Sequence, residues 1–173
     1  MNEIILNNIK KIKLMIFLLC LTPVYILIYE IIKNDLSANP IEYILKFSGK
    51  WSINFLMFSL AITPLRRIFK LNWLIKFRRM IGLFAFFYVL SHFLIWLGLE
   101  QGFELSDVVN EIKKRPFILI GFAAFIMMLP LALTSFNKAI KFLGGSLWQK
   151  IHNLVYVIRL FAVINLYLIK TFK

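Results

Sequence analysis

The two histidines of the sequence are the strongest candidates for binding a metal ion or moving protons. His92 lies within FFYVLSHFLIWLGLE, residues 86–100, part of an apolar run that is long enough to cross a bilayer as a helix. A titratable ring is costly inside such a run, which indicates a functional role such as metal ligation or proton transfer. The alternative is a neutral imidazole that is hydrogen-bonded to a neighbouring helix.

The positions of the histidines along their helices predict that they lie at different depths in a membrane. His92 is the 13th residue after Arg79, which places it about 20 Å from that basic edge at the rise of an α-helix. His152 follows Lys150 by two residues, so its expected depth is only about 3 Å. Axial ligands approach a haem iron from opposite faces at one level, so these two rings cannot easily serve one iron.

Two further polar residues interrupt the last apolar run of the chain. Asn165 is level with His92 by the same arithmetic, but an amide is a poor axial ligand for haem iron. Arg159 stands seven residues after His152, so the two should share a helix face. Its guanidinium could bind a haem propionate or a lipid phosphate. The alternative is an arginine that reaches towards another helix or a water-filled gap.

A strongly basic segment, TPLRRIFKLNWLIKFRRM at residues 63–80, mixes six cations with aromatic residues. Four of the cations are Arg66, Arg67, Arg78 and Arg79. With the aromatic residues between them, they could hold the phosphate and ring of a flavin nucleotide such as FMN. The alternative is an interfacial helix that lies on anionic lipid. The sequence has no glycine-rich nucleotide fingerprint, metalloprotease motif or nucleophile elbow.

Long apolar segments must position all of these residues. The chain has 173 residues, of which 61% are apolar, and they occur in unbroken blocks that a soluble domain would not contain. The sequence therefore predicts an all-α fold, an integral membrane bundle of five transmembrane helices. The predicted spans are about Leu14–Ile32, Ile53–Leu65 (with an earlier start near Phe47), Met80–Leu99, Pro116–Leu133 and Ile151–Ile169.

The charge distribution predicts the orientation of these spans. The net charge of +13 fits cations that flank membrane spans and meet anionic lipid, rather than a nucleic-acid partner. The segments between spans two and three and between spans four and five are basic and contain no acidic residue, whereas seven of the eight acidic residues lie on the other two loops. The basic segments and the N-terminus should therefore be cytoplasmic.

The length of the chain allows one membrane domain and no separate soluble module. We expect residues 1–40 to form an N-terminal basic segment with the first membrane helix, and residues 41–173 to form the remaining transmembrane domain. No small-residue cleavage site follows the first span, which predicts a membrane anchor rather than a signal peptide. Cys20 has no second cysteine with which to form an intrachain disulfide.

Several short motifs occur in order over about residues 40 to 170. They are TPLRR at 63–67, RRMIGL at 78–83 running on to SH at 91–92, KRPF at 114–117, LALTS at 131–135 and LWQKIHNLVY at 147–156. In order and spacing these motifs resemble the ferric reductase-like transmembrane domain family. Within that family the sequence is similar to the haem-binding membrane subunits of bacterial periplasmic methionine sulfoxide reductase systems.

The resemblance implies a multi-pass electron-transfer subunit of an oxidoreductase complex in the bacterial inner membrane, rather than the catalytic subunit. It implies b-type haem, with His92 and His152 matching family histidines implicated in haem binding, and also FMN. Electrons would pass from a quinone or flavin reductase donor to a periplasmic molybdenum-cofactor subunit that reduces methionine sulfoxide in oxidised proteins. Alternatives are a ferric- or quinone-reductase-type membrane cytochrome without that partner, and a cofactor-free membrane scaffold subunit.

The sequence departs from the family pattern at one candidate ligand. The family has a third histidine on span five, and the matching residue here is Asn165. A five-coordinate iron, a different ligand, a relocated haem and loss of the cofactor all remain open on this ground. A second departure is that the family usually continues into a sixth span, whereas this sequence stops at Lys173.

Overall fold

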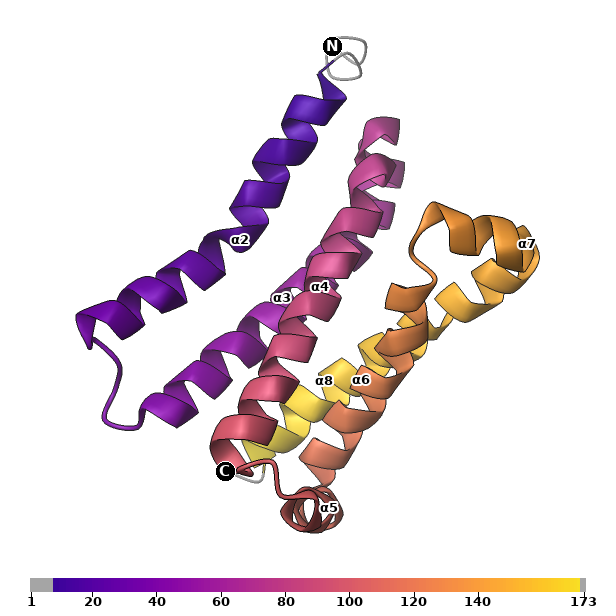
Figure 1. Cartoon of the computed structure of the whole chain (residues 1–173). Helices are drawn as coiled ribbons and strands as arrows, with labels where there is room; N and C mark the ends of the chain where they lie inside the picture. The colour runs from indigo at the N-terminus through magenta and orange to yellow at the C-terminus, as the bar shows by residue number, and fades with distance from the viewer. Residues whose placement is uncertain (1–7, 172–173) are drawn as a thin grey trace. The chain divides into compact units, whose positions relative to one another are not determined.

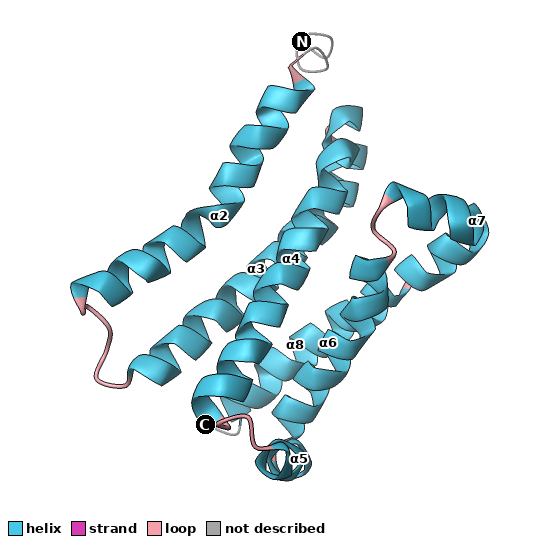
Figure 2. Cartoon of the chain, viewed as in Figure 1, coloured by secondary structure: helices cyan, strands magenta, loops and turns pink. Residues whose placement is uncertain are grey.

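The structure, a computed structural model, describes residues 8–171, so residues 1–7 of the expected N-terminal segment lie outside the described residues. Within this range the regular structure is entirely helical, and short loops join the helices (Figure 2). The chain folds as two compact units, residues 1–88 and 89–173, and helix α4 contributes to both. The predicted all-α fold is confirmed.

Seven α-helices and two short helical segments follow one another along the described residues, and Figure 1 labels the α-helices. The short segments are a 3₁₀ turn, η1, and a π-helical turn, η2. In chain order the elements are α2 (Ile9–Lys33), α3 (Pro40–Ile68), η1 (Asn72–Leu74), α4 (Ile75–Ile95), η2 (Trp96–Glu100), α5 (Leu105–Lys114), α6 (Pro116–Leu133), α7 (Asn137–His152) and α8 (Leu154–Thr171).

Each predicted span falls in helical structure, and four helical segments are long and apolar enough to cross a membrane. Those segments are Ile9–Lys33, Asn72–Glu100, Pro116–Leu133 and Asn137–Thr171. The predicted second span lies in α3, a 29-residue helix whose apolar run is diluted by Lys50, Asn54 and several serines. The chain is therefore a helical membrane protein, and the predicted count of five spans is approximate.

An aromatic cluster joins the three helices of the first unit. The Phe55 ring of α3 stacks on the Tyr88 ring of α4, with centroids 4.8 Å apart and planes 4° apart. The Phe84 ring meets Phe17 of α2 at 5.2 Å in an edge-to-face contact. Tyr88 also donates a 2.7 Å hydrogen bond to the backbone carbonyl of Cys20 in α2. Buried rings and a satisfied phenol thus fix the first part of α4 against α2 and α3.

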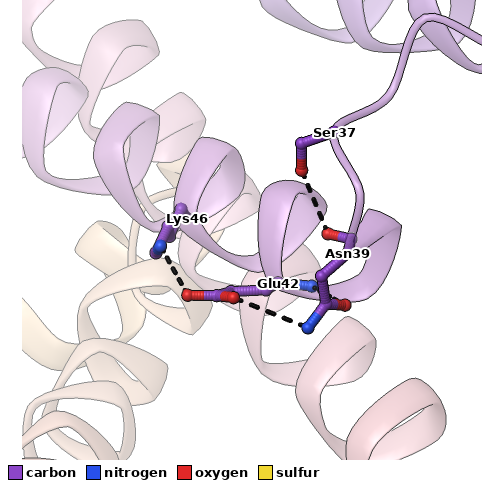
Figure 3. Close-up of polar contacts among 4 residues, drawn as sticks. All are labelled: Ser37, Asn39, Glu42 and Lys46. Carbon is purple, nitrogen blue, oxygen red and sulfur yellow. Dashed lines mark hydrogen bonds and ion pairs between the residues drawn. The ribbon is translucent and has the colours of Figure 1, made fainter.

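Local polar contacts explain why α3 begins where it does. Pro40 occupies the first helical position, where its missing N–H is not needed. The Asn39 side chain accepts a hydrogen bond from the Glu42 backbone N–H, and Ser37 donates to the Asn39 carbonyl (Figure 3). Glu42 in turn forms an ion pair with Lys46 one turn later. The N-cap and the carboxylate in the first turn both favour a helix start here.

Helices α6 and α8 lie side by side in the second unit, with α5 and α7 at opposite ends of α6 (Figure 1). Asn165 of α8 donates a hydrogen bond from its amide to the Phe117 carbonyl of α6. A Cβ added to Gly121 would lie 3.1 Å from the same amide nitrogen. Phe93 at the end of α4 stacks on Phe125 of α6, with ring centroids 4.7 Å apart.

Two helices of the second unit were not predicted. The short helix α5 has one apolar face, on which Val108 is buried, and it is too short to cross a bilayer. Helix α7 occupies the basic segment that was expected to be a loop, and it is interrupted at Gly144, whose φ of 73° suits a residue without a Cβ. His152 is consequently the last residue of α7 and precedes α8.

Candidate functional site

Helix α4 holds His92 within its last turn, three residues before the α-helix ends at Ile95. The helix is continuous from Arg79 to His92, so the separation of about 20 Å along its axis follows from the helical rise. The imidazole is partly buried. One turn later the chain passes into the π-helix η2, a rare geometry that frequently occurs at functional sites.

His152 belongs to a cluster of three side chains, Thr134, Trp148 and His152, which forms where the ends of α6 and α7 meet. The His152 Nε2 atom lies 3.2 Å from the Thr134 hydroxyl oxygen. The imidazole stacks on the Trp148 indole, with ring centroids 4.0 Å apart and planes 29° apart. The indole nitrogen of Trp148 donates a 3.0 Å hydrogen bond to the Thr134 backbone carbonyl. Trp148 therefore fixes the plane of this imidazole, and Thr134 fixes the position of its Nε2 atom.

The other two polar residues of the final helix have different surroundings. The Asn165 amide is bonded to the backbone of α6, which accounts for an amide inside an apolar helix without a ligand. Arg159 is exposed and forms no ion pair with any of residues 8–171. Because α7 ends at His152 and α8 begins at Leu154, Arg159 and His152 lie on successive helices rather than on one continuous helix.

The basic segment runs from the end of α3 through η1 into the start of α4. Trp73 in η1 has a buried indole nitrogen that meets no hydrogen-bond partner among residues 8–171. Its ring packs edge-to-face on Phe77, which is 2% exposed. Only the three residues of η1 separate α3 from α4 as regular structure, so the basic segment has no longer helix of its own between these two helices. The candidate arginines are partly buried (Arg66, Arg78) or exposed (Arg67, Arg79).

The donor set suits a haem better than a bare metal ion. Within residues 8–171 no three His, Cys, Asp or Glu side chains come together in a group that could hold a metal ion. A porphyrin supplies four nitrogens itself, so the protein need provide only one or two axial ligands, for which imidazole is a common choice. Phe93 stacks on Phe125 one residue after His92 in the sequence. His92 and His152 could each provide one imidazole ligand to a haem.

Sequence reasoning did not identify Thr134 and Trp148 as part of the site. Trp148 stands four residues before His152, a helical spacing that places the two side chains on one face and that could have indicated the stacking. Thr134 is 18 residues away in the sequence, and no local pattern connects it with His152.

Comparison with known proteins identifies the family to which this chain is similar. The model of the ferric reductase like transmembrane component matches residues 48–163. The chain is 45% identical over 162 residues to the protein-methionine-sulfoxide reductase heme-binding subunit MsrQ of Herminiimonas arsenicoxydans, covering 94% of this chain and 74% of that protein. It is 47% identical over 146 residues to MsrQ of Polaromonas naphthalenivorans, covering 84% and 67%.

A relative with a different name matches a similar region. The magnetosome protein MamZ of Paramagnetospirillum magneticum is 42% identical over 132 residues, which cover 76% of this chain and 20% of MamZ. No solved structure matches the chain. The family match spans more than half of the sequence, and the relatives named MsrQ align over most of it. This chain therefore belongs to the ferric reductase like transmembrane component family.

Proposed function

We propose that the chain is a haem b electron-transfer subunit of the bacterial inner membrane. It would pass electrons from a quinone or flavin reductase to a periplasmic molybdenum-cofactor subunit that reduces methionine sulfoxide in oxidised proteins. The observation that carries the proposal is a partly buried imidazole, His92, inside an apolar helix of a chain whose close relatives are named heme-binding subunits. The family domain would be residues 41–173, which contain the matched range 48–163.

Each candidate residue has a distinct task in this proposal. A bound haem supplies reversible one-electron transfer, and the protein supplies ligands, orientation and electrostatics. His92 would hold a haem towards the periplasmic side, and His152 would hold a cofactor nearer the cytoplasmic side. Two separate positions are expected because His92 lies in the last turn of α4, whereas His152 is the last residue of α7. The exposed guanidinium of Arg159 is available to neutralise an acidic group of the cofactor.

The basic segment is the electron-entry side in this proposal. Trp73 supports a ligand there, because a buried indole N–H normally has an acceptor and this one has none among residues 8–171. An oxygen of an isoalloxazine or a phosphate group could fill that place. Guanidinium groups bind phosphate through paired hydrogen bonds, which suits FMN. The arginines concerned are Arg66, Arg67, Arg78 and Arg79, with the N-terminus on the same cytoplasmic side.

An absorption spectrum of the full-length chain in detergent tests the haem directly. We expect reduced-minus-oxidised bands of b-type haem, and we expect His92→Ala to remove the periplasmic-side haem and its share of those bands. Ser91→Ala, at the adjacent position of the same helix, is the matched control and should retain the spectrum. A colourless wild-type protein with a normal helical circular dichroism signal would refute the electron-transfer role and favour the cofactor-free scaffold.

The same preparation tests the flavin. FMN released by denaturation should fluoresce, and Arg66→Gln together with Arg67→Gln should reduce the amount that is released because phosphate contacts are lost. Lys138→Gln with Lys141→Gln, which removes two charges from α7, serves as the control for net charge. Absence of flavin fluorescence from the wild-type protein would exclude FMN as a resident cofactor and leave the basic segment as a lipid-binding surface.

A second candidate keeps the haem but not the sulfoxide reductase partner. The match to MamZ favours this second candidate, because a similar region also occurs in a relative that is not named as a sulfoxide reductase subunit. The matched region makes up only 20% of the length of MamZ. The two candidates differ in the electron acceptor. Dithionite-reduced chain should be reoxidised rapidly by a molybdenum-cofactor sulfoxide reductase subunit with methionine sulfoxide if the first candidate is right. Reoxidation by ferric chelates or quinones alone would favour the second.

A further inference from the structure

Helix α5 is tied closely to the ends of two segments that are long and apolar enough to cross a membrane. Four residues separate it from the end of the segment Asn72–Glu100, and only Arg115 separates it from the start of α6. Arg115 is extended, with φ −116° and ψ 105°, as expected before a proline, where the helical conformation is disfavoured. The chain therefore turns a corner, and Figure 1 shows α5 nearly end-on while α6 runs along the page. Helix α5 thus lies crosswise to α6, at the level where α6 begins.

One edge of α5 is both apolar and exposed. Leu105, Val108, Val109 and Ile112 recur at helical spacing and form its apolar face. Val108 is buried, whereas Leu105 is 76% and Val109 is 48% exposed. Lys113 stands one turn after Val109, is exposed, and forms no ion pair with any of residues 8–171. A lysine beside exposed apolar side chains is typical of a helix at a membrane surface, because its stem covers apolar groups while its ammonium reaches water or phosphate.

The opposite face of α5 lines an open polar recess of about 270 Å³. Asp107 and Asn110 of α5 contribute to the lining, and so do Glu100 and its neighbour Gln101 at the end of η2. A space lined by charged and amide groups holds water rather than hydrocarbon, because burying such groups in an apolar medium is costly. The two sides of α5 therefore require different surroundings, one apolar and one aqueous.

The loop before α5 extends the apolar edge by one aromatic ring. Phe103 is 68% exposed and has a positive φ of 63°, which is uncommon for a residue with a side chain. Its backbone N–H donates a 3.0 Å hydrogen bond to the Leu97 carbonyl of η2, which helps to hold this conformation. A Cβ added to Gly98 would lie 3.1 Å from the Phe103 Cζ atom, so the ring lies over η2. A bulky ring is thus held at the surface of the chain, beside the end of a span.

We propose that α5 is an interfacial membrane helix. Its apolar edge, formed by Phe103, Leu105 and Val109, lies about 5–10 Å into the headgroup and acyl boundary, and its polar recess opens to the adjoining water. A lipid surface is favoured over a protein partner because the connections at both ends of α5 hold it at the bilayer boundary. In the proposed orientation this is the periplasmic leaflet. Lipid phosphates there would also account for the cations at residues 113–115, on a loop that is otherwise acidic. This inference does not depend on the haem.

Fluorescence measurements of depth on single-cysteine chains test this placement. In a Cys20→Ala background, Val109→Cys is labelled with the environment-sensitive dye NBD, and the full-length chain is reconstituted into phosphatidylcholine–phosphatidylglycerol vesicles with iodide on both sides. We expect blue-shifted emission and weak quenching by iodide. Lipids with a nitroxide near the headgroup should quench the label several-fold more strongly than lipids with a nitroxide at the end of the acyl chain. Asn110→Cys, on the polar side, is the matched control and should be quenched mainly by iodide.

Three results for the label at Val109 would overturn the proposal. Quenching by iodide as strong as at Asn110 would place the apolar edge in water. Stronger quenching by the deep nitroxide than by the shallow one would place α5 inside the hydrocarbon. Protection from both iodide and nitroxide lipids would mean that protein, such as a second copy of the chain, covers this edge instead of lipid.

One added charge on either side of the helix tests the apolar edge itself. Leu105→Glu places a carboxylate one turn before the label at Val109, so the emission should shift to the red and quenching by iodide should rise several-fold. Asn110→Glu adds the same charge on the side that lines the recess and should change neither quantity. Circular dichroism checks that both variants remain helical. Unchanged emission and quenching in Leu105→Glu would show that the connections alone hold α5 in place, which would overturn the role of its apolar edge.

Discussion

Polar side chains in this protein repeatedly donate to backbone carbonyls of neighbouring helices. Tyr88 donates to Cys20, Asn165 to Phe117 and Trp148 to Thr134. A helical carbonyl oxygen has a second lone pair that its own helix does not use, so it can accept such a bond without breaking the helix. In an apolar environment a donor without a partner is costly, which explains why each of these polar groups is paired.

Tyr88→Phe should lower the free energy of unfolding by about 1 kcal/mol, because the bond from the buried phenol to Cys20 is lost while the ring stacking remains. Tyr43→Phe is the matched control. Its hydroxyl bonds to Glu30 at 2.9 Å in a less buried position, where water can replace it, so a smaller loss is expected. Circular dichroism recorded while both variants unfold in detergent measures these losses in unfolding free energy. A larger loss for Tyr43→Phe than for Tyr88→Phe would contradict the prediction.

At the level of elements, a small residue permits the close approach of α6 and α8. Gly121 faces the Asn165 amide, and any Cβ there would lie within 3.1 Å of the amide nitrogen. Glycine at a helix contact allows such an approach and is common between membrane helices. The interhelical hydrogen bond and the missing side chain are therefore coupled, because a Cβ at Gly121 would make a tight contact with the amide that forms the bond.

Gly121→Ala should destabilise the protein by about 1–3 kcal/mol, the usual cost of overpacking. The same substitution in an Asn165→Ala background should cost little, because the side chain that it would meet is gone. Gly145→Ala, in α7 with open space around the added carbon, is the control and should be neutral or slightly stabilising. A double-mutant cycle of unfolding free energies measures the coupling, and strictly additive effects would show that Gly121 and Asn165 do not oppose each other.

For the whole molecule, the distribution of charge is the main external property. The formal net charge is +13, and the basic residues are concentrated in segments that adjoin the ends of apolar helices. Cations retained on the cytoplasmic side determine how a membrane protein is oriented. The same segments would be attracted to anionic lipid. Orientation therefore decides on which side of the membrane the basic segment and the acidic loops lie.

Cysteine labelling in intact cells tests this orientation. Cys20 is only 6% exposed, so the native thiol should give little background. A membrane-impermeant thiol reagent should label Glu104→Cys from outside, whereas Lys76→Cys should react only after the inner membrane is opened, because the basic segment is expected to be cytoplasmic. Glu104 and Lys76 are both exposed, which makes them comparable. The reverse pattern would invert the proposed topology and place the basic segment on the periplasmic side.

The sequence by itself determined the class of fold and much of the helix placement. Helix α6 begins at Pro116 and ends at Leu133, the predicted bounds. Such bounds can be predicted because they depend on local properties, namely an uninterrupted apolar run and a proline at the first turn. A bilayer also leaves the backbone of an apolar segment few choices besides a helix, since every N–H and C=O must be paired within the chain.

The tertiary structure decided what the polar residues do. The amphipathic helix α5 and the interrupted helix α7 were missed, since neither forms a long apolar run. Asn165 was considered as a failed ligand, and the structure gives it a carbonyl partner 48 residues away. Thr134 reaches His152 only because the fold brings the end of α6 against the end of α7, 18 residues later in the sequence. Such contacts depend on packing between elements, which the local pattern of apolar and polar residues does not encode.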